Sequence, residues 1–210
     1  MPPKYPIFRP RLGIILSLSI PRVESFESLK ALVDATTEES LEKNIFGIIG
    51  LGNFARAVYK HKEKLRHVWM LTSDVTEPYI GHYEYFLKKF MPDAAISFVD
   101  DDETSTKLDS SSDMRSIESA KDIVAKILSA KNLERMALSK SDVVVDVTGG
   151  TKMISIGMVF GAFQKDMDFQ YVEQKSHEVV TMQIPVEIVL DKVAAYLQEI
   201  HDANCAGGAH

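Results

Sequence analysis

The sequence predicts an α/β fold: a Rossmann-like, open and mostly parallel sheet with helices on both faces. Short apolar runs typical of buried strands alternate with amphipathic helical patterns along the chain. The connections between successive strands are long enough for parallel crossovers. Polar or glycine-rich turns follow several strands, and such sheets bind ligands outside the carboxyl ends of their strands. We therefore expect turns that are far apart in the sequence to meet on one rim.

Composition limits the classes of function. A chain of 210 residues suits one domain, or one domain with a small appendage. The formal net charge of −6 argues against a binder of long nucleic acid, which needs a broad basic face. The longest apolar run, residues 12–20, is too short to span a bilayer, and Pro21 follows where a signal peptide would have a cleavage site. The single cysteine, Cys205, rules out a disulfide framework and indicates a reducing compartment.

The first 43 residues are predicted to be an N-terminal extension of strand and helix. Residues 12–18 form its strand, and apolar positions 26, 29, 32 and 33 have helical spacing. Thr36 and Glu39 have the spacing of a capping box before a second short helix.

The Rossmann-like unit is predicted to span residues 44–185, followed by a C-terminal helix and a flexible tail at 186–210. Within it we expect strands at 45–51, 67–72, 95–99, 143–147, 169–172 and 179–184. Helical spacing is found at 55–65, 79–90, 117–128, from 153 onward, and at 186–200. Residues 100–113 form a predicted polar loop.

The segment 141–163 combines a strand, a glycine turn and the start of a helix. Two glycines allow the backbone to approach a ligand closely, and the first amides of a helix are free to bind an anion. Lys152 adds a positive charge, and Thr148 and Thr151 add hydroxyl groups. This combination predicts a phosphate site, the alternative being a structural turn with a solvated lysine.

The spacing of this turn differs from that of known phosphate loops. A Walker loop needs four residues between its first glycine and its Gly-Lys pair, which the turn lacks. The nearest stretch to a dinucleotide fingerprint is Gly50-Leu51-Gly52, but Ala55 stands where the third glycine is often found. An ordinary Rossmann binder of a nucleotide cofactor is therefore a disfavoured alternative.

Residues 146–153, DVTGGTKM, closely resemble the D-x-T-G-G-T-K-x-M signature of CARF domains, the CRISPR-associated Rossmann-fold sensors. The resemblance covers about residues 44–185. The turns at 50–54 and 72–76 fall where the first two ligand-contacting loops of such a domain would lie. The residues that it marks as ligand-binding are Gly50, Gly52, Asn53, Phe54, Thr72, Ser73, Asp74, Thr76, Thr148, Gly149, Gly150, Thr151, Lys152 and Met153.

The resemblance implies a homodimeric allosteric sensor of cyclic oligoadenylate, the second messenger of type III CRISPR antiviral defence, with cyclic tetra-adenylate favoured. A cyclic tetra- or hexanucleotide has twofold symmetry and can sit on a dimer axis. Each phosphate would take the amides of residues 149–152 and the charge of Lys152, and adenines would lodge against Phe54. The effector would lie elsewhere, so the protein is either cytoplasmic or the soluble part of a membrane-anchored effector.

The second reading of the resemblance is a ring nuclease that cleaves its own ligand without a metal. A ribose 2′-hydroxyl would attack the adjacent phosphate in line, and the pocket would align the groups and stabilise the charge that develops. Lys152 and Thr151 would serve this step, with Ser73 orienting the ribose.

No metal or cofactor is expected, because the histidines at positions 61, 67, 82, 177, 201 and 210 form no HxH or HxxxH pair. The carboxylates at 100–103 are better explained as a solvated loop than as a magnesium site. Gly157 and Gly161 predict a close approach of their helix either to the sheet or to a partner helix. The core is expected to include Met153, Ile156, Phe160 and Phe163.

Overall fold

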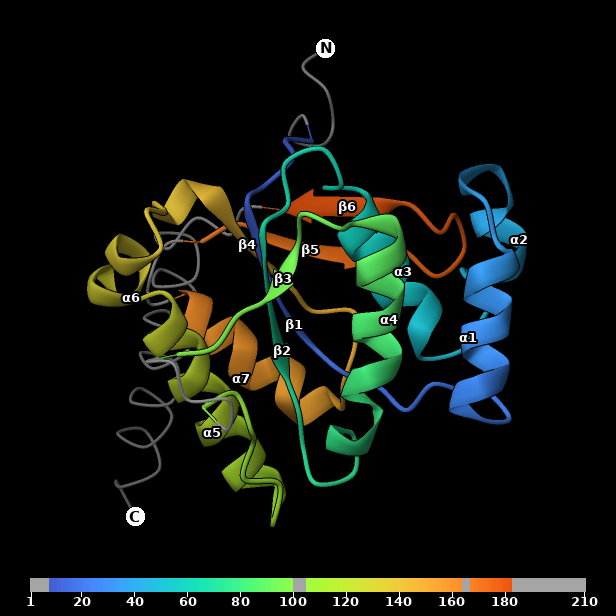
Figure 1. Cartoon of the computed structure of the whole chain (residues 1–210). Coiled ribbons are helices and arrows are strands. Elements are labelled where there is room, and N and C mark those ends of the chain that lie inside the picture. The colour runs from blue at the N-terminus through green and yellow to red at the C-terminus, as the bar shows by residue number, and fades with distance from the viewer. Residues whose placement is uncertain (1–7, 100–104, 164–166, 183–210) are drawn as a thin grey trace, which may run out of the picture.

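The computed structural model describes residues 8–99, 105–163 and 167–182, and its centre is one six-stranded sheet (Figure 1). The strand order is β3-β2-β1-β4-β5-β6. The first five strands run parallel, and β6 is antiparallel to β5. The strands are β1 (Gly13–Ser17), β2 (His67–Leu71), β3 (Ala95–Ile96), β4 (Val143–Asp146), β5 (Phe169–Val172) and β6 (Val179–Met182).

Helices cover both faces of the sheet, which confirms the predicted fold class. The strand residues alternate between two cores: Ile14 and Leu16 of β1 enter one, and Ile15 enters the other. On one face lie α1 (Phe26–Ala35), α2 (Leu41–Asn44), α3 (Leu51–Tyr59) and α4 (Ile80–Phe90). On the other lie α5 (Asp113–Ile127), α6 (Ala130–Arg135) and α7 (Lys152–Phe163).

Two expectations about the N-terminal third need correction. Strand β1, assigned to an extension at residues 1–43, lies between β2 and β4 at the centre of the sheet. The strand expected at 45–51 is instead a turn that leads into α3. Its apolar residues are not buried alike, because Ile45 is fully buried whereas Ile49 is 60% exposed. A short apolar run cannot by itself separate a buried strand from one turn of helix.

Smaller differences concern element ends. Strand β3 stops at Ile96, three residues before the predicted end, and helix α5 begins at Asp113, four residues before the first apolar position of its pattern. The capping box lies one residue later than predicted, at Thr37 and Ser40. The helix and tail expected at 186–210 lie outside the described residues.

Helices α5 and α7 pack side by side and parallel, through the two glycines of α7 (Figure 1). A Cβ atom at Gly157 would lie 2.4 Å from the carbonyl oxygen of Ile117, and one at Gly161 would lie 2.5 Å from that of Lys121. These glycines therefore serve contact with α5, which was neither of the two expected partners. The outer side of α7 is free of this contact, so Ile156 and Phe160 are 40% and 52% exposed rather than core.

No helix among the described residues combines the length and the apolar character needed to cross a bilayer.

Candidate functional site

A cavity of about 960 Å³ opens at the carboxyl ends of β1, β2 and β4. The order in which strands are added to the sheet reverses between β1 and β4. Strands β2 and β3 lie on one side of β1, and β4, β5 and β6 lie on the other. Ligands of open α/β sheets bind at this switch point. The cavity wall includes these predicted residues: Gly50, Asn53, Ser73, Thr76, Gly150, Thr151, Lys152 and Met153.

Three helices, α3, α5 and α7, begin at this cavity, and each contributes residues of its first turn. A helix N-terminus carries partial positive charge and unpaired amides, which suits it to bind an anion. Thr151 caps α7: its Oγ1 accepts from the Ile154 amide at 3.4 Å, and its carbonyl oxygen accepts from the Ser155 amide at 3.0 Å. Within the described residues the amides of Lys152 and Met153 make no hydrogen bond and stay available.

The glycines of the turn at 148–152 are required by the protein itself. A Cβ atom at Gly149 would lie 2.5 Å from the carbonyl oxygen of Ser17, and one at Gly150 would lie 2.3 Å from Ser17 Oγ. Gly150 also has φ +78°, a conformation that favours glycine. These glycines therefore make room for the end of β1. The close approach of a ligand to the same turn stays a prediction.

The loop after β1 is the part of the site that sequence reasoning missed. It passes between two glycine turns: Ser19 Oγ accepts from the Gly150 amide at 3.3 Å, and a Cβ atom at Gly50 would lie 2.3 Å from the carbonyl oxygen of Ile20. Ser17 is 4% exposed, and its Oγ has no hydrogen-bond partner among the described residues. Glycines at 50, 149 and 150 signal a close approach, but the sequence does not say what approaches them.

Two cations in the cavity have no carboxylate partner. Lys152 and Arg22 both line it, both are exposed, and neither forms an ion pair within the described part of the chain. Asp113 is the acidic residue in the same wall. Although the chain carries a net charge of −6, this cavity therefore offers an excess of positive charge.

The remaining predicted ligand residues do not line the cavity. Phe54 is 6% exposed, with its ring edge-on to Tyr83 at 4.7 Å, so it belongs to the core and cannot receive an adenine. Thr148 Oγ1 accepts from the Val172 amide at 2.7 Å and thus extends the pairing of β4 with β5. Gly52 lies against the backbone of residue 46, and Gly149 against that of residue 17.

Apolar surface on the cavity rim comes from aliphatic side chains instead. Ile20 is 45% exposed, and Ile49 and Val75 are each 60% exposed. All three line the cavity. Flat apolar groups of a ligand would meet these side chains rather than Phe54.

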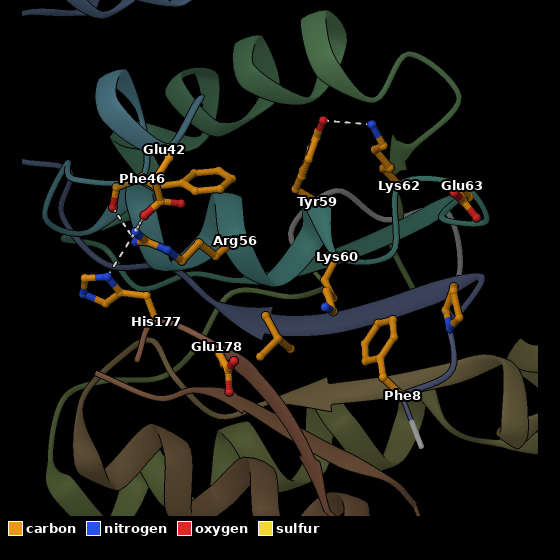
Figure 2. A pocket seen from close by; sticks show the side chains of 12 residues that line it. Phe8, Glu42, Phe46, Arg56, Tyr59, Lys60, Lys62, Glu63, His177 and Glu178 are labelled. Atoms are coloured by element: carbon orange, nitrogen blue, oxygen red, sulfur yellow. Dashed lines mark hydrogen bonds and ion pairs between the residues drawn. The ribbon is translucent and has the colours of Figure 1, made fainter. Parts of the chain in front are cut away.

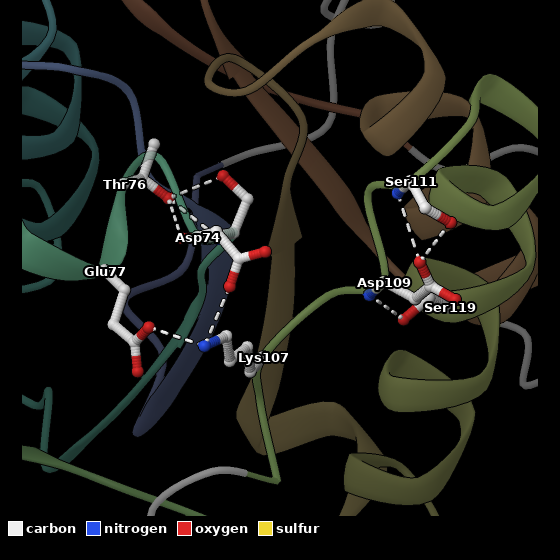
Figure 3. Close-up of polar contacts among 8 residues, drawn as sticks. Asp74, Thr76, Glu77, Lys107, Asp109, Ser111 and Ser119 are labelled. Atoms are coloured by element: carbon white, nitrogen blue, oxygen red, sulfur yellow. Dashed lines mark hydrogen bonds and ion pairs between the residues drawn. The ribbon is translucent and has the colours of Figure 1, made fainter.

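One wall of the cavity is held together by Lys107 (Figure 3). Its Nζ lies 2.7 Å from Glu77 Oε2 and 2.9 Å from Asp74 Oδ1, and these two carboxylates raise the pKa of Lys107. The backbone of Thr72, a buried residue, pairs with residues 106 and 108 on the same segment. Asp74 and Thr72 thus build the wall from behind, while Ser73 and Thr76 line it.

A second cavity, of about 710 Å³, lies beside α3 and the β5–β6 turn (Figure 2). Two of its three cations, Arg56 and Lys62, have carboxylate partners, and the third, Lys60, lies over the ring of Phe8 at 5.0 Å. Arg56 donates to Phe46 O at 2.6 Å and pairs with Glu42 at 2.5 Å, and Lys62 pairs with Glu38 at 2.6 Å. Three carboxylates, of Glu42, Glu63 and Glu178, line the same cavity and balance these charges, so the first cavity has the larger excess of positive charge.

Two buried titratable groups, Asp146 and His61, are connected through Gln170 behind the glycine turn at 148–152. Burial raises the pKa of Asp146 to about 6, against hydrogen bonds from Gln170 and Thr148 that lower it. Burial lowers the pKa of His61 to about 4. Across the described residues, no group of three or more His, Cys, Asp or Glu side chains is placed to hold a metal ion.

The fold and the site together define a doubly wound α/β protein with a cavity at its switch point that is lined by two unpaired cations and one carboxylate among the described residues. No protein-family profile and no curated protein matches the sequence. Similar solved structures include Can2 from Sulfobacillus thermosulfidooxidans in complex with cyclic tetra-adenylate, with 10% identity and a TM-score of 0.47 over 83% of this chain and 38% of Can2. Another is protein VC1899 from Vibrio cholerae, with 9% identity and a TM-score of 0.44 over 83% of this chain and 34% of VC1899. The chain thus spans little more than a third of the length of either protein.

Proposed function

We propose that this chain binds cyclic oligoadenylate, with cyclic tetra-adenylate favoured, and that it does so as a homodimer that controls an effector in type III CRISPR defence. The proposal joins the resemblance of residues 146–153 to the CARF signature with the geometry of the cavity. The observation that carries it is the start of α7, where free amides and the unpaired Lys152 open onto a cavity at the switch point.

The cavity suits a phosphodiester with an adenine attached. A phosphate would take the amides of Lys152 and Met153, together with the positive end of the α7 dipole. Arg22, on the opposite loop, would provide a second charge for the same or the next phosphate. The adenine faces would lie against Ile20, Ile49 and Val75 on the rim.

A dimer follows from the symmetry of the ligand. A cyclic tetranucleotide with twofold symmetry presents the same groups to two copies of one cavity. Exposed apolar side chains on α5 and α7 support a second copy, since Met114, Ile156 and Phe160 are 63%, 40% and 52% exposed. Ile156 and Phe160 lie one turn apart on the same side of α7, and adjacent exposed apolar side chains of this kind are typical of protein interfaces.

The test is calorimetric titration of the purified chain with cyclic tetra-adenylate and cyclic hexa-adenylate. We expect one ring to bind per dimer. Lys152→Ala should weaken binding about tenfold to a hundredfold, the range of a charge-assisted contact of about 1.5–3 kcal/mol. Lys140→Ala is the matched control. It removes an exposed lysine just before the first residue of β4, away from the cavity, and should leave the affinity unchanged. Failure of both rings to bind refutes the proposal.

Ring cleavage is the second candidate, and it is favoured by one observation: Lys152, Thr151 and Ser73 line the same cavity. The ribose 2′-oxygen would form a bond to the adjacent phosphorus as it loses its proton. The bond from phosphorus to the 5′-oxygen would break, and that oxygen would take up a proton. Lys152 would stabilise the negative charge on the phosphorane oxygens.

Chromatography of the ligand after long incubation separates the two candidates. An intact ring favours the sensor. A linear product with a 2′,3′-cyclic phosphate end favours the nuclease, provided that Lys152→Ala abolishes it and Lys140→Ala does not.

A further inference from the structure

A chain of buried hydrogen bonds connects the start of β1 with the glycine turn at its other end. The Arg11 amide donates to His61 Nδ1 at 2.9 Å, and His61 Nε2 lies 2.6 Å from Gln170 Oε1. Gln170 Nε2 donates to Asp146 Oδ2 at 3.0 Å, and the Thr148 amide donates to Asp146 Oδ1 at 2.9 Å. The exposed fractions of His61, Gln170 and Asp146 are 1%, 0% and 2%.

The direction of every bond in this chain is fixed. A backbone amide only donates, so His61 Nδ1 accepts from Arg11, and in the neutral imidazole Nε2 then carries the proton. Gln170 therefore turns its oxygen to His61 and its NH₂ group to Asp146 and to Ala57 O, at 3.5 Å. The opposite amide orientation would place an oxygen against the carboxylate and an NH₂ group against the imidazole N–H.

The chain of hydrogen bonds ends at Thr148, the first residue of the glycine turn. Asp146 is the last residue of β4 and pairs with Gln170 of β5, so both side chains point to the face of the sheet that α3 covers. Thr148 is held at two points, because its amide binds Asp146 and its hydroxyl binds the Val172 amide. The path of the turn toward Lys152 is thereby set from inside the sheet.

We propose that His61, Gln170 and Asp146 are positioning residues for the turn at 148–152. The hydrogen-bonded chain directs the Asp146 carboxylate at the Thr148 amide and so keeps the start of α7, with Lys152, in its anion-binding arrangement. For the ligand, this inference rests on the proposed function, while the conformation of the turn can be tested without any ligand.

Exchanging the two cross-strand partners gives a sharp test. Asp146→Asn replaces one of two acceptor oxygens by an NH₂ group, so this group must face a donor, either the NH₂ group of Gln170 or the Thr148 amide. Gln170→Glu places two carboxylates together. In the double variant the new amide at 146 donates to the new carboxylate at 170, which also accepts from His61, and the amide oxygen at 146 still accepts from Thr148. The bonds that connect residues 11, 61, 170, 146 and 148 are then restored with the charge moved by one residue, and the long contact of residue 170 with Ala57 O is lost.

The first measurement is hydrogen exchange of the Thr148 amide, by NMR, on ligand-free protein. We expect Asp146→Asn to speed exchange about tenfold or more, the effect of losing a buried hydrogen bond. The double variant should bring the rate back to within about threefold of the wild type. Unchanged exchange in the single variant, or no recovery in a folded double variant, overturns the proposal. If Asp146→Asn does not fold, Gln170→Met takes its place, and the same rise in exchange is expected.

The second measurement is the affinity for cyclic tetra-adenylate. It should fall about tenfold in the single variant and recover in the double variant. A loss of affinity that persists in the double variant while Thr148 exchange recovers overturns the link to Lys152. If the wild type binds no cyclic oligoadenylate, the proposed function fails, and the Thr148 exchange rates still decide whether these residues position the turn.

Discussion

Replacing His61 and replacing Asp146 should change the pH dependence of stability in opposite directions. Burial raises the pKa of the Asp146 carboxyl from 3.8 to about 6. The contribution of Asp146 to stability is therefore present below pH 4 and is lost as the pH rises through about 6, when a buried group must ionise. Burial lowers the pKa of His61 from 6.5 to about 4. Its contribution is present above pH 6.5 and is lost as the pH falls toward 4.

The two contributions are similar in size, and their opposite effects on the slope of the free energy of unfolding against pH cancel in the wild type. Each pKa differs from its ordinary value by about two pKa units. One pKa unit corresponds to about 1.4 kcal/mol, so each contribution amounts to about 3 kcal/mol. Between about pH 4.5 and 6.5, Asp146→Asn should make the free energy of unfolding rise with pH more steeply than in the wild type. His61→Gln should make it rise less steeply or fall.

Urea unfolding, followed by circular dichroism at half-unit pH steps from 4.5 to 7, measures these slopes as differences from the wild type. Other titrating groups are common to all variants and drop out of the comparison. The combination of Asp146→Asn with His61→Gln is the control and should return to the slope of the wild type, since both contributions are absent. Parallel curves for the wild type and both single variants would refute the assignment of these two pKa values.

Three further outcomes concern single residues. Gly150→Ala, at φ +78°, should destabilise the fold by at least about 1–2 kcal/mol, whereas Gly47→Ala, with no heavy atom within 4 Å of the new Cβ, should not; thermal melts compare them. Gly157→Ala should lower the melting temperature by separating α5 from α7, while Gly81→Ala, in an open position on α4, should raise it slightly; equal shifts would contradict the packing argument. Phe160→Ser should shift the sedimentation of the proposed dimer toward the monomer, and a dimer that this change leaves intact would place the interface elsewhere.

All six strands of the sheet were predictable from the sequence because each contains a short apolar run that carries its own signal. Val143, Val144 and Val145 are buried on both sides, as such a run requires. The prediction of a strand at 45–51 was wrong because Gly47, Gly50 and the exposed Ile49 belong to a turn. The apolar pattern of this turn is the same as that of a buried strand. The central position of β1 depends on pairing with β2 and β4, which no local pattern encodes.

The candidate site was predictable only where the chemistry is local. Lys152 at the start of a helix predicts an anion site, because its charge and the free amides are adjacent in the sequence. Arg22 reaches the same cavity from a loop 130 residues earlier, and nothing in its own neighbourhood indicates this. Phe54 gave a false signal, since an aromatic residue suits both an adenine and a core, and its helical position beneath Tyr83 decides for the core.

The glycine signature divides its residues between two tasks. Gly149 and Gly150 admit the backbone and side chain of Ser17, and Thr148 binds Asp146 and β5, so these residues shape the turn. Lys152 makes no contact that the fold needs within the described residues. A turn with glycines but without the lysine would therefore still fold, and its affinity for an anion would fall. The lysine without the glycines would have no rigid support, because the end of β1 could not pack beneath the turn.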